Sequence, residues 1–321
     1  MLRYLTQRFI AFVPTLLGVS ILIFAAIRAV PGDSIVAMLG TEAGMLTETQ
    51  RASLEAYFGL DRPPVEQYFR WMGGVVRCDL GLSVRHGAPV LDVILSRFPL
   101  TLQLALMAML IALAIGVPIG ILSAVKHNSI IDLFGRLIGL LGLATPAFLL
   151  GTLIIFVLSF YFKMQPNSGN YISFAQDPRA NLSQLIFPAF TLGFSFSASV
   201  MRTTRSAMLE VLGQDYVRTA RSKGLTERVV IQRHALRNAL IPLVTIISVE
   251  IGYLLGGTVI VEEIFALPGL GRLVYNAISQ RDYALVQGIA LFVAFNFVAI
   301  NLIADLIYAA VDPRISYAHN I

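Results

Sequence analysis

Apolar residues gather in six long runs along the chain, separated by more polar segments. The runs are residues 9–30, 100–125, 137–162, 185–208, 236–261 and 285–310. As a helix, the first run would extend about 33 Å, and the hydrocarbon core of a bilayer is about 30 Å thick. Pro31-Gly32-Asp33 follows it in place of the small residues of a signal cleavage site, so this run predicts an uncleaved span. The pattern therefore predicts an all-α membrane protein with six spanning helices.

The longest polar segment, residues 31–99, follows the first run. Thr47 and Gln50 have the spacing of a capping box, which predicts a helix from Thr47 to Tyr57 that ends at Gly59. A further element should begin at Pro63-Pro64 and pack an apolar face on the membrane domain; that face carries Tyr68, Phe69, Trp71 and Met72. From its residues alone, this segment is a connecting domain between the first two spans.

Basic residues indicate the orientation of the six spans. If the N-terminus lies inside the cell, the inner segments hold 13 Lys and Arg in 65 positions, and the outer segments hold 10 in 114. Cytoplasmic loops of membrane proteins carry an excess of basic residues. We therefore predict that both termini are cytoplasmic and that residues 31–99 lie outside.

The composition narrows the class of protein further. Only 13% of the residues are charged, against about 25% in an average soluble protein. The net charge of +5 is explained by basic inner loops rather than by nucleic-acid binding. A single cysteine excludes an internal disulfide framework, and four histidines far apart in the sequence do not predict a metal site.

The longest polar stretch between two strongly apolar ones runs from Asp215 to Pro242. Asp215 can cap a short helix that continues to Lys223, and Gly224 suits the left-handed position just beyond a helix end. Thr226 can then cap a second helix that leads into the next span. The stretch predicts a short helix, a glycine bend and a second helix.

Polar residues within the apolar runs are candidates for a translocation pathway. Glu250 lies near the middle of the fifth run, where an unpaired carboxylate would cost about 2.5–3.5 kcal/mol. It either faces a pathway, where it attracts a cationic group, or makes a structural hydrogen bond between helices. Asp305 lies near the end of the sixth run and favours a structural bond. Further polar residues that line a path or join helices are Gln103, Ser195, Ser197, Ser199, Asn296 and Asn301.

The sequence offers no chemistry typical of an enzyme. It contains no phosphate-binding loop of the Gly-x-x-x-x-Gly-Lys-Ser/Thr kind, so ATP-driven motion would have to come from partner subunits. Gly193-Phe194-Ser195 is weakly similar to the serine motif of an intramembrane protease, but no histidine lies within a span to activate the serine. An ion-coupled secondary transporter, with Glu250 or Asp305 as the proton site, is the alternative from another class.

The polar stretch resembles the cytoplasmic EAA loop of ABC-transporter permease subunits. Ala220 and Gly224 match the second alanine and the glycine of that motif, whereas Arg218 and Thr219 replace its acid and first alanine, and Pro242 comes several residues late. This departure resembles the dipeptide/oligopeptide/nickel permease subfamily. Other matching segments, in the same order, are residues 31–33, 59–63, 79–83, 268–272, 281–283 and 301–302.

The resemblance implies a type I ABC importer permease in the bacterial inner membrane. Its parts would be a first span at 1–30, a periplasmic region at 31–99, a permease core at 100–312 and a cytoplasmic tail at 313–321. Region 31–99 would then meet a substrate-binding protein. The remaining partners would be a second, homologous permease, two cytoplasmic ATPases that use the ATP, and membrane lipid.

The resemblance also assigns roles to residues. The loop at 209–237 would contact the ATPases through Asp215, Arg218, Thr219, Ala220, Arg221, Lys223 and Gly224. Glu250, Ser197 and Asn296 are the pathway candidates. Within the subfamily, di- and oligopeptides are the expected substrate, and glutathione, nickel chelates, opines and sugars stay open.

Overall fold

The computed structural model describes residues 2–29, 47–50, 53, 61–166 and 170–311, and in these the chain is helical apart from one small hairpin. In chain order the elements are α1 (Leu2–Arg28), α4 (Pro64–Val75), β1 (Leu82–Ser83), β2 (Ala88–Pro89), α5 (Val90–Val125), α6 (Ile130–Ala144), α7 (Ala147–Tyr161), α8 (Pro178–Leu212), α9 (Asp215–Ser222), α10 (Glu227–Val229), the π-helix η2 (Val230–Ala235), α11 (Leu236–Ala239), α12 (Ile241–Gly257), α13 (Val259–Ile264), α14 (Leu270–Ser279) and α15 (Tyr283–Val311). The predicted helical class is confirmed.

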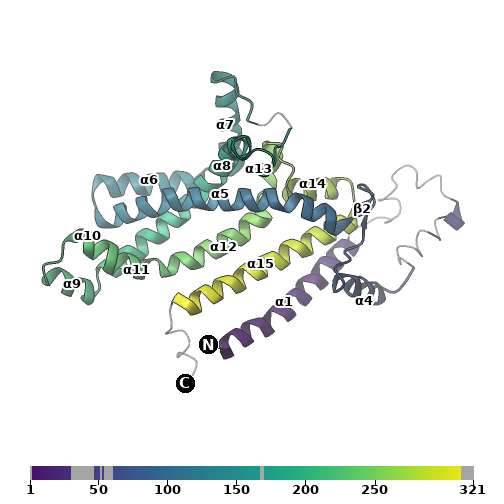
Figure 1. Cartoon of the computed structure of the whole chain (residues 1–321), viewed down its shortest axis with the longest axis horizontal. Helices are drawn as coiled ribbons and strands as arrows, with labels where there is room; N and C mark the ends of the chain where they lie inside the picture. Colours follow the sequence, from purple (N-terminus) through teal and green to yellow (C-terminus); the bar gives the residue numbers. More distant parts are fainter. Residues whose placement is uncertain (1, 30–46, 51–52, 54–60, 167–169, 312–321) are drawn as a thin grey trace.

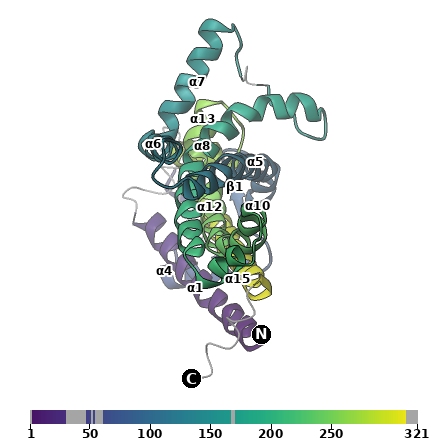
Figure 2. The ribbon, with the colours of Figure 1, turned by 90° about the vertical axis from the view of Figure 1, so that its left-hand side faces the viewer.

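The long helices lie side by side, and the shorter elements gather at the two ends of the bundle (Figure 1). α9, α10 and α11 form one end, whereas α4, the hairpin and α14 form the other (Figure 1). α7 projects away from the long helices (Figure 2). The short elements α9, α10 and α11 are therefore remote from α4, the hairpin and α14 (Figure 1).

The predicted spans correspond to four single helices and two bent pairs. The single helices that are long and apolar enough to cross a membrane are Ile10–Arg28, Val90–Val125, Pro178–Leu212 and Tyr283–Ala304. The pair Ile130–Ala144 and Ala147–Tyr161 bends by 97°, and the pair Glu227–Ala239 and Pro242–Leu254 bends by 52°. Six spans result if each pair crosses once.

The third apolar run is not one straight helix as its length suggests. It breaks at Thr145, which has φ −87° and ψ 113°, between α6 and α7. The physical reason is Pro146, because a proline disfavours the helical conformation of the residue before it. The second run also differs from the prediction, since its helix α5 begins at Val90 rather than at residue 100.

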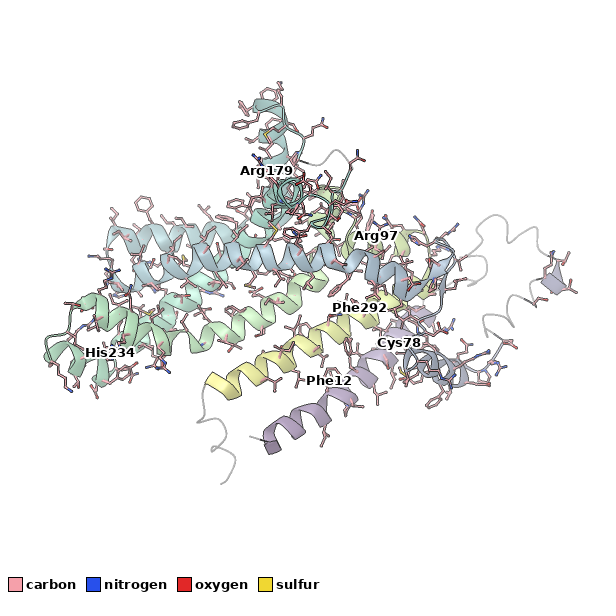
Figure 3. The ribbon with its side chains drawn as sticks, in the orientation of Figure 1. Phe12, Cys78, Arg97, Arg179, His234 and Phe292 are labelled. Atoms are coloured by element: carbon pink, nitrogen blue, oxygen red, sulfur yellow. The ribbon has the colours of Figure 1, made fainter. Side chains whose placement is uncertain are left out.

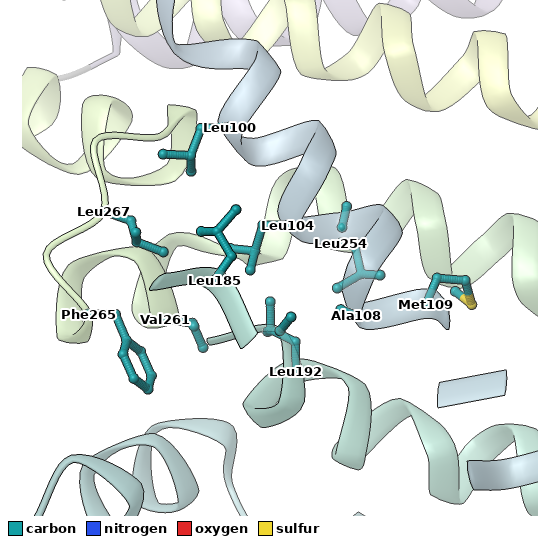
Figure 4. Close-up of a cluster of buried hydrophobic side chains, with 12 residues drawn as sticks. Leu100, Leu104, Ala108, Met109, Leu185, Leu192, Leu254, Val261, Phe265 and Leu267 are labelled. Atoms are coloured by element: carbon teal, nitrogen blue, oxygen red, sulfur yellow. The ribbon is translucent and has the colours of Figure 1, made fainter. Parts of the chain in front are cut away.

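The main core lies where α5, α8, α12 and α13 meet. Leu104 and Leu185 are fully buried there, and Phe265 closes the cluster from the loop after α13 (Figure 4). This core holds the N-terminal halves of α5 and α8 against the end of the fifth apolar run. It therefore fixes the elements on which the pathway candidates lie.

α5 and α8 approach closely through glycines. A Cβ atom on Gly116 would lie 2.6 Å from the Ser197 carbonyl oxygen, and one on Gly120 would lie 2.7 Å from that of Met201. From the other side, a Cβ on Gly193 would lie 2.6 Å from the Ala108 carbonyl oxygen. Small residues allow helix backbones to approach in this way within membranes.

The segment between α1 and α5 agrees with the sequence where it is described. Gln50 N–H donates to Thr47 Oγ1 (3.3 Å) and Thr47 N–H donates to Gln50 Oε1 (2.9 Å), which confirms the predicted capping box. The predicted end of that helix, from Tyr57 to Gly59, lies outside the described residues. α4 begins at Pro64 as predicted.

α4 packs an aromatic face on α1. Phe24 of α1 lies edge-on to Tyr68 and stacks with Trp71, at ring-centroid distances of 5.5 and 6.1 Å. The Tyr68 hydroxyl is 2.8 Å from Ser20 Oγ, which is buried in the middle of α1. Tyr68 and Trp71 of the predicted apolar face therefore pack on α1, whereas Phe69, which was predicted to belong to the same face, is 68% exposed.

Two buried carboxylates join motifs that are far apart in sequence. Asp282 accepts hydrogen bonds from Ser83 Oγ (2.6 Å) and from the Arg85 N–H (3.3 Å), so it ties the hairpin to the start of α15. Glu262 is fully buried and accepts from Thr101 Oγ1 (2.7 Å) and from the Arg272 N–H (3.0 Å). Together they fix the end of the bundle that carries the hairpin and α14.

Candidate functional site

The short helix α9 occupies Asp215–Ser222, between the long helix α8 and the glycine bend. The prediction that Asp215 caps it is wrong by one residue, because Gln214 takes the extended cap conformation and Asp215 is the first helical residue. The Asp215 carboxylate instead lies 3.5 Å from Arg218. An acid in the first turn still interacts favourably with the helix dipole.

α9 has an inner apolar face and an outer polar face. Val217 and Ala220 are buried against Val230, with Val211 and Leu212 packed around them. Ala220 therefore uses its small size for packing within this chain, whereas the expectation was close approach to a partner. The outward side chains on and just after the helix are Asp215, Tyr216, Arg218, Thr219, Arg221, Ser222 and Lys223.

The bend after α9 follows the sequence prediction at its glycine. Gly224 has φ +77°, a conformation that glycine adopts without strain, and its N–H donates to the Arg221 carbonyl oxygen (2.9 Å). Thr226 lies at the N-cap of α10 as predicted. Its side chain, however, makes no capping hydrogen bond. The predicted second helix is also irregular, since α10 passes into the π-helix η2 before α11.

An ion pair spans the glycine bend. Arg221 Nη2 lies 2.7 Å from Glu227 Oε1, and its Nε lies 3.2 Å from Oε2. The hydrogen bond to this carboxylate raises the pKa of the Arg221 guanidinium above its ordinary value. The pair holds α9 at a defined angle to α10, so the polar face of α9 is presented in one orientation.

A second candidate site is a cavity of about 320 Å³ beside the bend between α6 and α7. Glu250 of α12 lines it, and so does Ser199 of α8. Ser195, one turn earlier on α8, also lines the cavity, and its buried hydroxyl has no hydrogen-bond partner among the described residues. Tyr253 and Thr145 complete the polar part of the wall.

The structure separates Glu250 from the two other pathway candidates. Ser197 is buried between α8 and α5, and its hydroxyl donates to the Phe194 carbonyl oxygen (2.6 Å). Asn296 donates to the Phe292 carbonyl oxygen on its own helix (2.8 Å). Neither lines the cavity of Glu250. The helical repeat gives the reason, because Ser195 and Ser199 are four residues apart on one face, whereas Ser197 points elsewhere.

The other polar candidates in the spans make structural bonds or are not described. Gln103 Nε2 donates to Asn181 Oδ1 (2.5 Å), which joins α5 to α8. Asn301 donates to the Phe297 carbonyl oxygen of its own helix (2.9 Å). The side chain of Asp305 lies outside the part of the chain that the structure describes.

A buried ion pair near α9 escaped the sequence reasoning. Asp132 of α6 is fully buried, and its two carboxylate oxygens accept from Arg205 Nε (2.7 Å) and Nη2 (2.9 Å) of α8. Arg136 lies 3.7 Å from the same carboxylate. The pair locks α6 to the part of α8 that leads into α9. Its sequence signal, an acid in one loop and a base at the end of another run, is too common to single out.

The described residues hold no group of three or more His, Cys, Asp and Glu side chains placed to bind a metal ion. The chemistry that the two sites offer is therefore of two kinds. α9 offers a polar surface of fixed orientation for another protein. The cavity offers one carboxyl group and hydroxyls that can bind a cationic or hydrogen-bonding solute.

Comparison with known proteins covers the whole chain. Residues 1–105 match the N-terminal part and residues 116–317 the main part of the family described as the inner membrane component of binding-protein-dependent transport systems. The dipeptide transport system permease protein of Escherichia coli K12 is 39% identical, with 99% of each chain covered. The oligopeptide transport system permease protein of Bacillus subtilis 168 is 40% identical, with 99% of this chain and 100% of the relative covered. The glutathione transport system permease protein of Escherichia coli O6:H1 is 39% identical, with 99% of this chain and 100% of the relative covered.

Solved structures agree on the fold. A chain of the MetNI methionine ABC transporter in an inward-facing conformation gives a TM-score of 0.55 at 19% identity, and covers 68% of this chain and 96% of its own. A chain of an amino acid ABC transporter gives a TM-score of 0.53 at 17% identity, and the match covers 68% of this chain and 94% of that chain. The bundle that carries α9 and the Glu250 cavity therefore has the architecture of these importer permeases.

Proposed function

Since this chain belongs to the inner membrane components of binding-protein-dependent transport systems, we propose that it forms half of the pore of a peptide importer. The chain is a multi-pass permease subunit of the ABC importer class. A second permease of the same fold would complete the pore. Two ATPase subunits inside and a substrate-binding protein outside would complete the transporter, with ATP hydrolysed by the ATPases alone.

The observation that carries the proposal is the form of α9. A short helix whose inner face is packed presents its outer polar face in a defined orientation, which suits that face to bind another protein. α9 keeps this orientation through the buried contacts of Val217 and Ala220 with Val230, and through the ion pair of Arg221 with Glu227. We propose that an ATPase binds its outer face, including Arg218, Thr219 and Lys223, and that movement of the ATPase moves α8 through α9.

Peptides are proposed as substrates because several similar permeases are named for them. Those named for dipeptides, oligopeptides and glutathione are all close to 40% identical to this chain. A peptide carries a protonated amine unless it is blocked, and the Glu250 cavity offers a carboxyl group with Ser195, Ser199 and Tyr253 around it. We propose that this cavity opens to the pathway and attracts the amine as the substrate passes.

Gly224 provides the test of the coupling role. With φ +77° and no atom within 4 Å of an added Cβ, substitution here causes backbone strain without a clash. Gly224→Val should shift α9 and abolish substrate-stimulated ATP hydrolysis and transport in liposomes that contain all subunits. Gly224→Asn is the matched control, because asparagine tolerates the left-handed region and should retain most coupling.

Two outcomes would contradict the proposal. If Gly224→Val assembles normally and keeps wild-type coupling, α9 is only a connector. If the purified chain transports solute without ATPases in response to an ion gradient, it is an ion-coupled transporter instead. In that case Glu250 would be the first residue to examine as the ion site.

A further inference from the structure

An apolar groove of about 360 Å³ runs between α1, α4 and α15, away from the Glu250 cavity. Phe12 of α1 and Phe292 of α15 both line the groove, and Cys78 lies near its end beside α4 (Figure 3). Of the described residues, only Ser20 and Cys78 line it with a hydroxyl or thiol group, and the Ser20 hydroxyl is hydrogen-bonded to Tyr68. The groove therefore offers almost only hydrocarbon contacts.

A second cavity of about 240 Å³ begins where the groove ends, and Leu80 lines both. Its wall contains Arg28, from the end of α1, and Arg70 of α4. The guanidinium of Arg28 turns back along α1 and lies 5.2 Å from the centre of the Phe24 ring. Among the described residues no carboxylate forms an ion pair with either arginine. Asp79 also lines this cavity, but its carboxylate accepts the Gly81 N–H (2.9 Å).

We propose that the groove and the second cavity together bind one anionic glycerophospholipid. One acyl chain lies along α1 between α4 and α15, and the phosphodiester lies between Arg28 and Arg70. Guanidinium groups form strong, charge-assisted hydrogen bonds to phosphate oxygens. The two arginines select the headgroup, and the apolar groove requires a membrane lipid rather than a soluble phosphate.

The dimensions fit a lipid in a single leaflet. From Phe12 to Ser20 the groove follows α1 for about 12 Å, and half of a hydrocarbon core is about 15 Å. Trp71 and Tyr68 lie next to the second cavity, and such aromatic residues are enriched at the membrane interface. The proposed headgroup site is therefore at the depth where a phosphate would lie.

Trp71 makes the proposal testable, because it is the only tryptophan of the chain and it lines the headgroup cavity. The complete transporter is placed in phosphatidylcholine vesicles with a rising fraction of phosphatidylglycerol brominated near the ester end of its acyl chains. The fluorescence of Trp71 is obtained as the difference between the tryptophan fluorescence of the wild-type complex and that of the Trp71→Phe complex, and its quenching by the bromine atoms is measured. Brominated phosphatidylcholine at the same fractions is the parallel series.

Half-maximal quenching should occur at about a 25-fold lower fraction of phosphatidylglycerol than of phosphatidylcholine, because each of the two arginines should contribute about fivefold. The Arg28→Gln and Arg70→Gln double variant should make the two lipids equivalent. Arg62→Gln is the matched control, because Arg62 is exposed beside α4, pairs with Glu66 and does not line either cavity. Val75→Phe narrows the groove without a charge change and should weaken quenching by both lipids.

Four results would overturn the proposal. Equal quenching by both lipids in the wild type would show that the groove meets ordinary bulk lipid. Quenching by neither would show that another protein, such as the second permease, covers the groove. Relief of quenching by soluble glycerol 3-phosphate would show that the arginines take a free phosphate. Loss of preference in Arg62→Gln as well would also count against the site.

Discussion

Four carboxyl groups within the helical bundle have very different surroundings. Asp132 is paired with Arg205, whereas Glu262 and Asp282 each accept several hydrogen bonds, and all three are buried. Burial of a carboxylate is tolerated only when its hydrogen-bonding capacity is used in this way. Glu250 borders a cavity that Ser195 and Ser199 also line, so its carboxyl group is accessible to a solute there. The first three are structural by this criterion.

Glu250→Gln keeps the size of the side chain and removes its charge. If the cavity receives the amine of a substrate, transport of peptides with a free amine should fall more than that of peptides with a blocked amine. Transport by reconstituted complexes, measured with matched pairs of blocked and free peptides, checks this. Glu210→Gln is the control, because Glu210 is exposed on the same α8 that carries Ser199 but does not line the cavity. Equal losses for both peptides would instead indicate a structural role.

Gly269 is predicted to be irreplaceable on packing grounds. A Cβ at this position would lie 2.3–2.4 Å from the carboxyl atoms of the buried Glu262. Gly269→Ala should therefore destabilise the permease by about 1–3 kcal/mol, the usual cost of an overpacked core. Thermal unfolding of the purified complex measures the effect. Gly73→Ala, on α4 with no atom within 4 Å of its added Cβ, should leave the unfolding temperature unchanged or slightly higher.

At the scale of elements, long apolar runs predicted the helices well, because burial in lipid requires satisfied backbone groups and leaves little choice besides a helix. The left-handed bend at Gly224 and the start of α4 at Pro64 were also predictable, since glycine and proline act through their own backbone. The break before Pro146 has the same kind of local cause. It was missed because the third apolar run is long enough to form one continuous spanning helix.

What could not be predicted depends on contacts distant in sequence. Glu262 follows the fifth apolar run and looks like an ordinary loop charge, but it is bonded to Thr101, which is 161 positions away. The inward packing of Ala220 likewise depends on Val230 and Leu212. That Ser195 and Ser199, and not Ser197, line the cavity of Glu250 depends on the orientation of α8, which its neighbours determine. Local patterns do not contain such information.

The α9–α10 element gives a prediction of its own. If Arg221 acts by holding α9 to Glu227, then Arg221→Glu or Glu227→Arg alone should reduce coupling, and the double exchange should restore most of it. An exposed pair of this kind contributes only about 0.2–1 kcal/mol, so stability should hardly change. Substrate-stimulated ATP hydrolysis in liposomes is the measurement. A double exchange as inactive as Arg221→Glu would show that Arg221 itself contacts the ATPase.

At the scale of the whole molecule, the two polar ends of the bundle should face opposite compartments. In a Cys78→Ser background, Ser53→Cys should react with an impermeant maleimide added to intact cells, whereas Ser222→Cys should react only after the cells are opened. The basis is the excess of basic residues in the predicted inner segments and the position of α9 away from α4 (Figure 1). The background removes the exposed Cys78. Labelling of Ser222→Cys outside would reverse the orientation.

The glycine contacts between α5 and α8 have a mechanical consequence. α5 has 36 residues and is about 54 Å long. At Gly116, Gly120 and Gly193 no side chain separates the backbones of α5 and α8, and this direct contact restrains α8 from sliding along α5. This close contact favours movement of α5 and α8 as one unit. A unit that tilts about its middle moves its two ends in opposite directions. If an ATPase binds α9 as proposed and draws that end toward the pore axis, the hairpin end would swing away from the axis, so the joined pair would close one mouth of the pore as it opens the other.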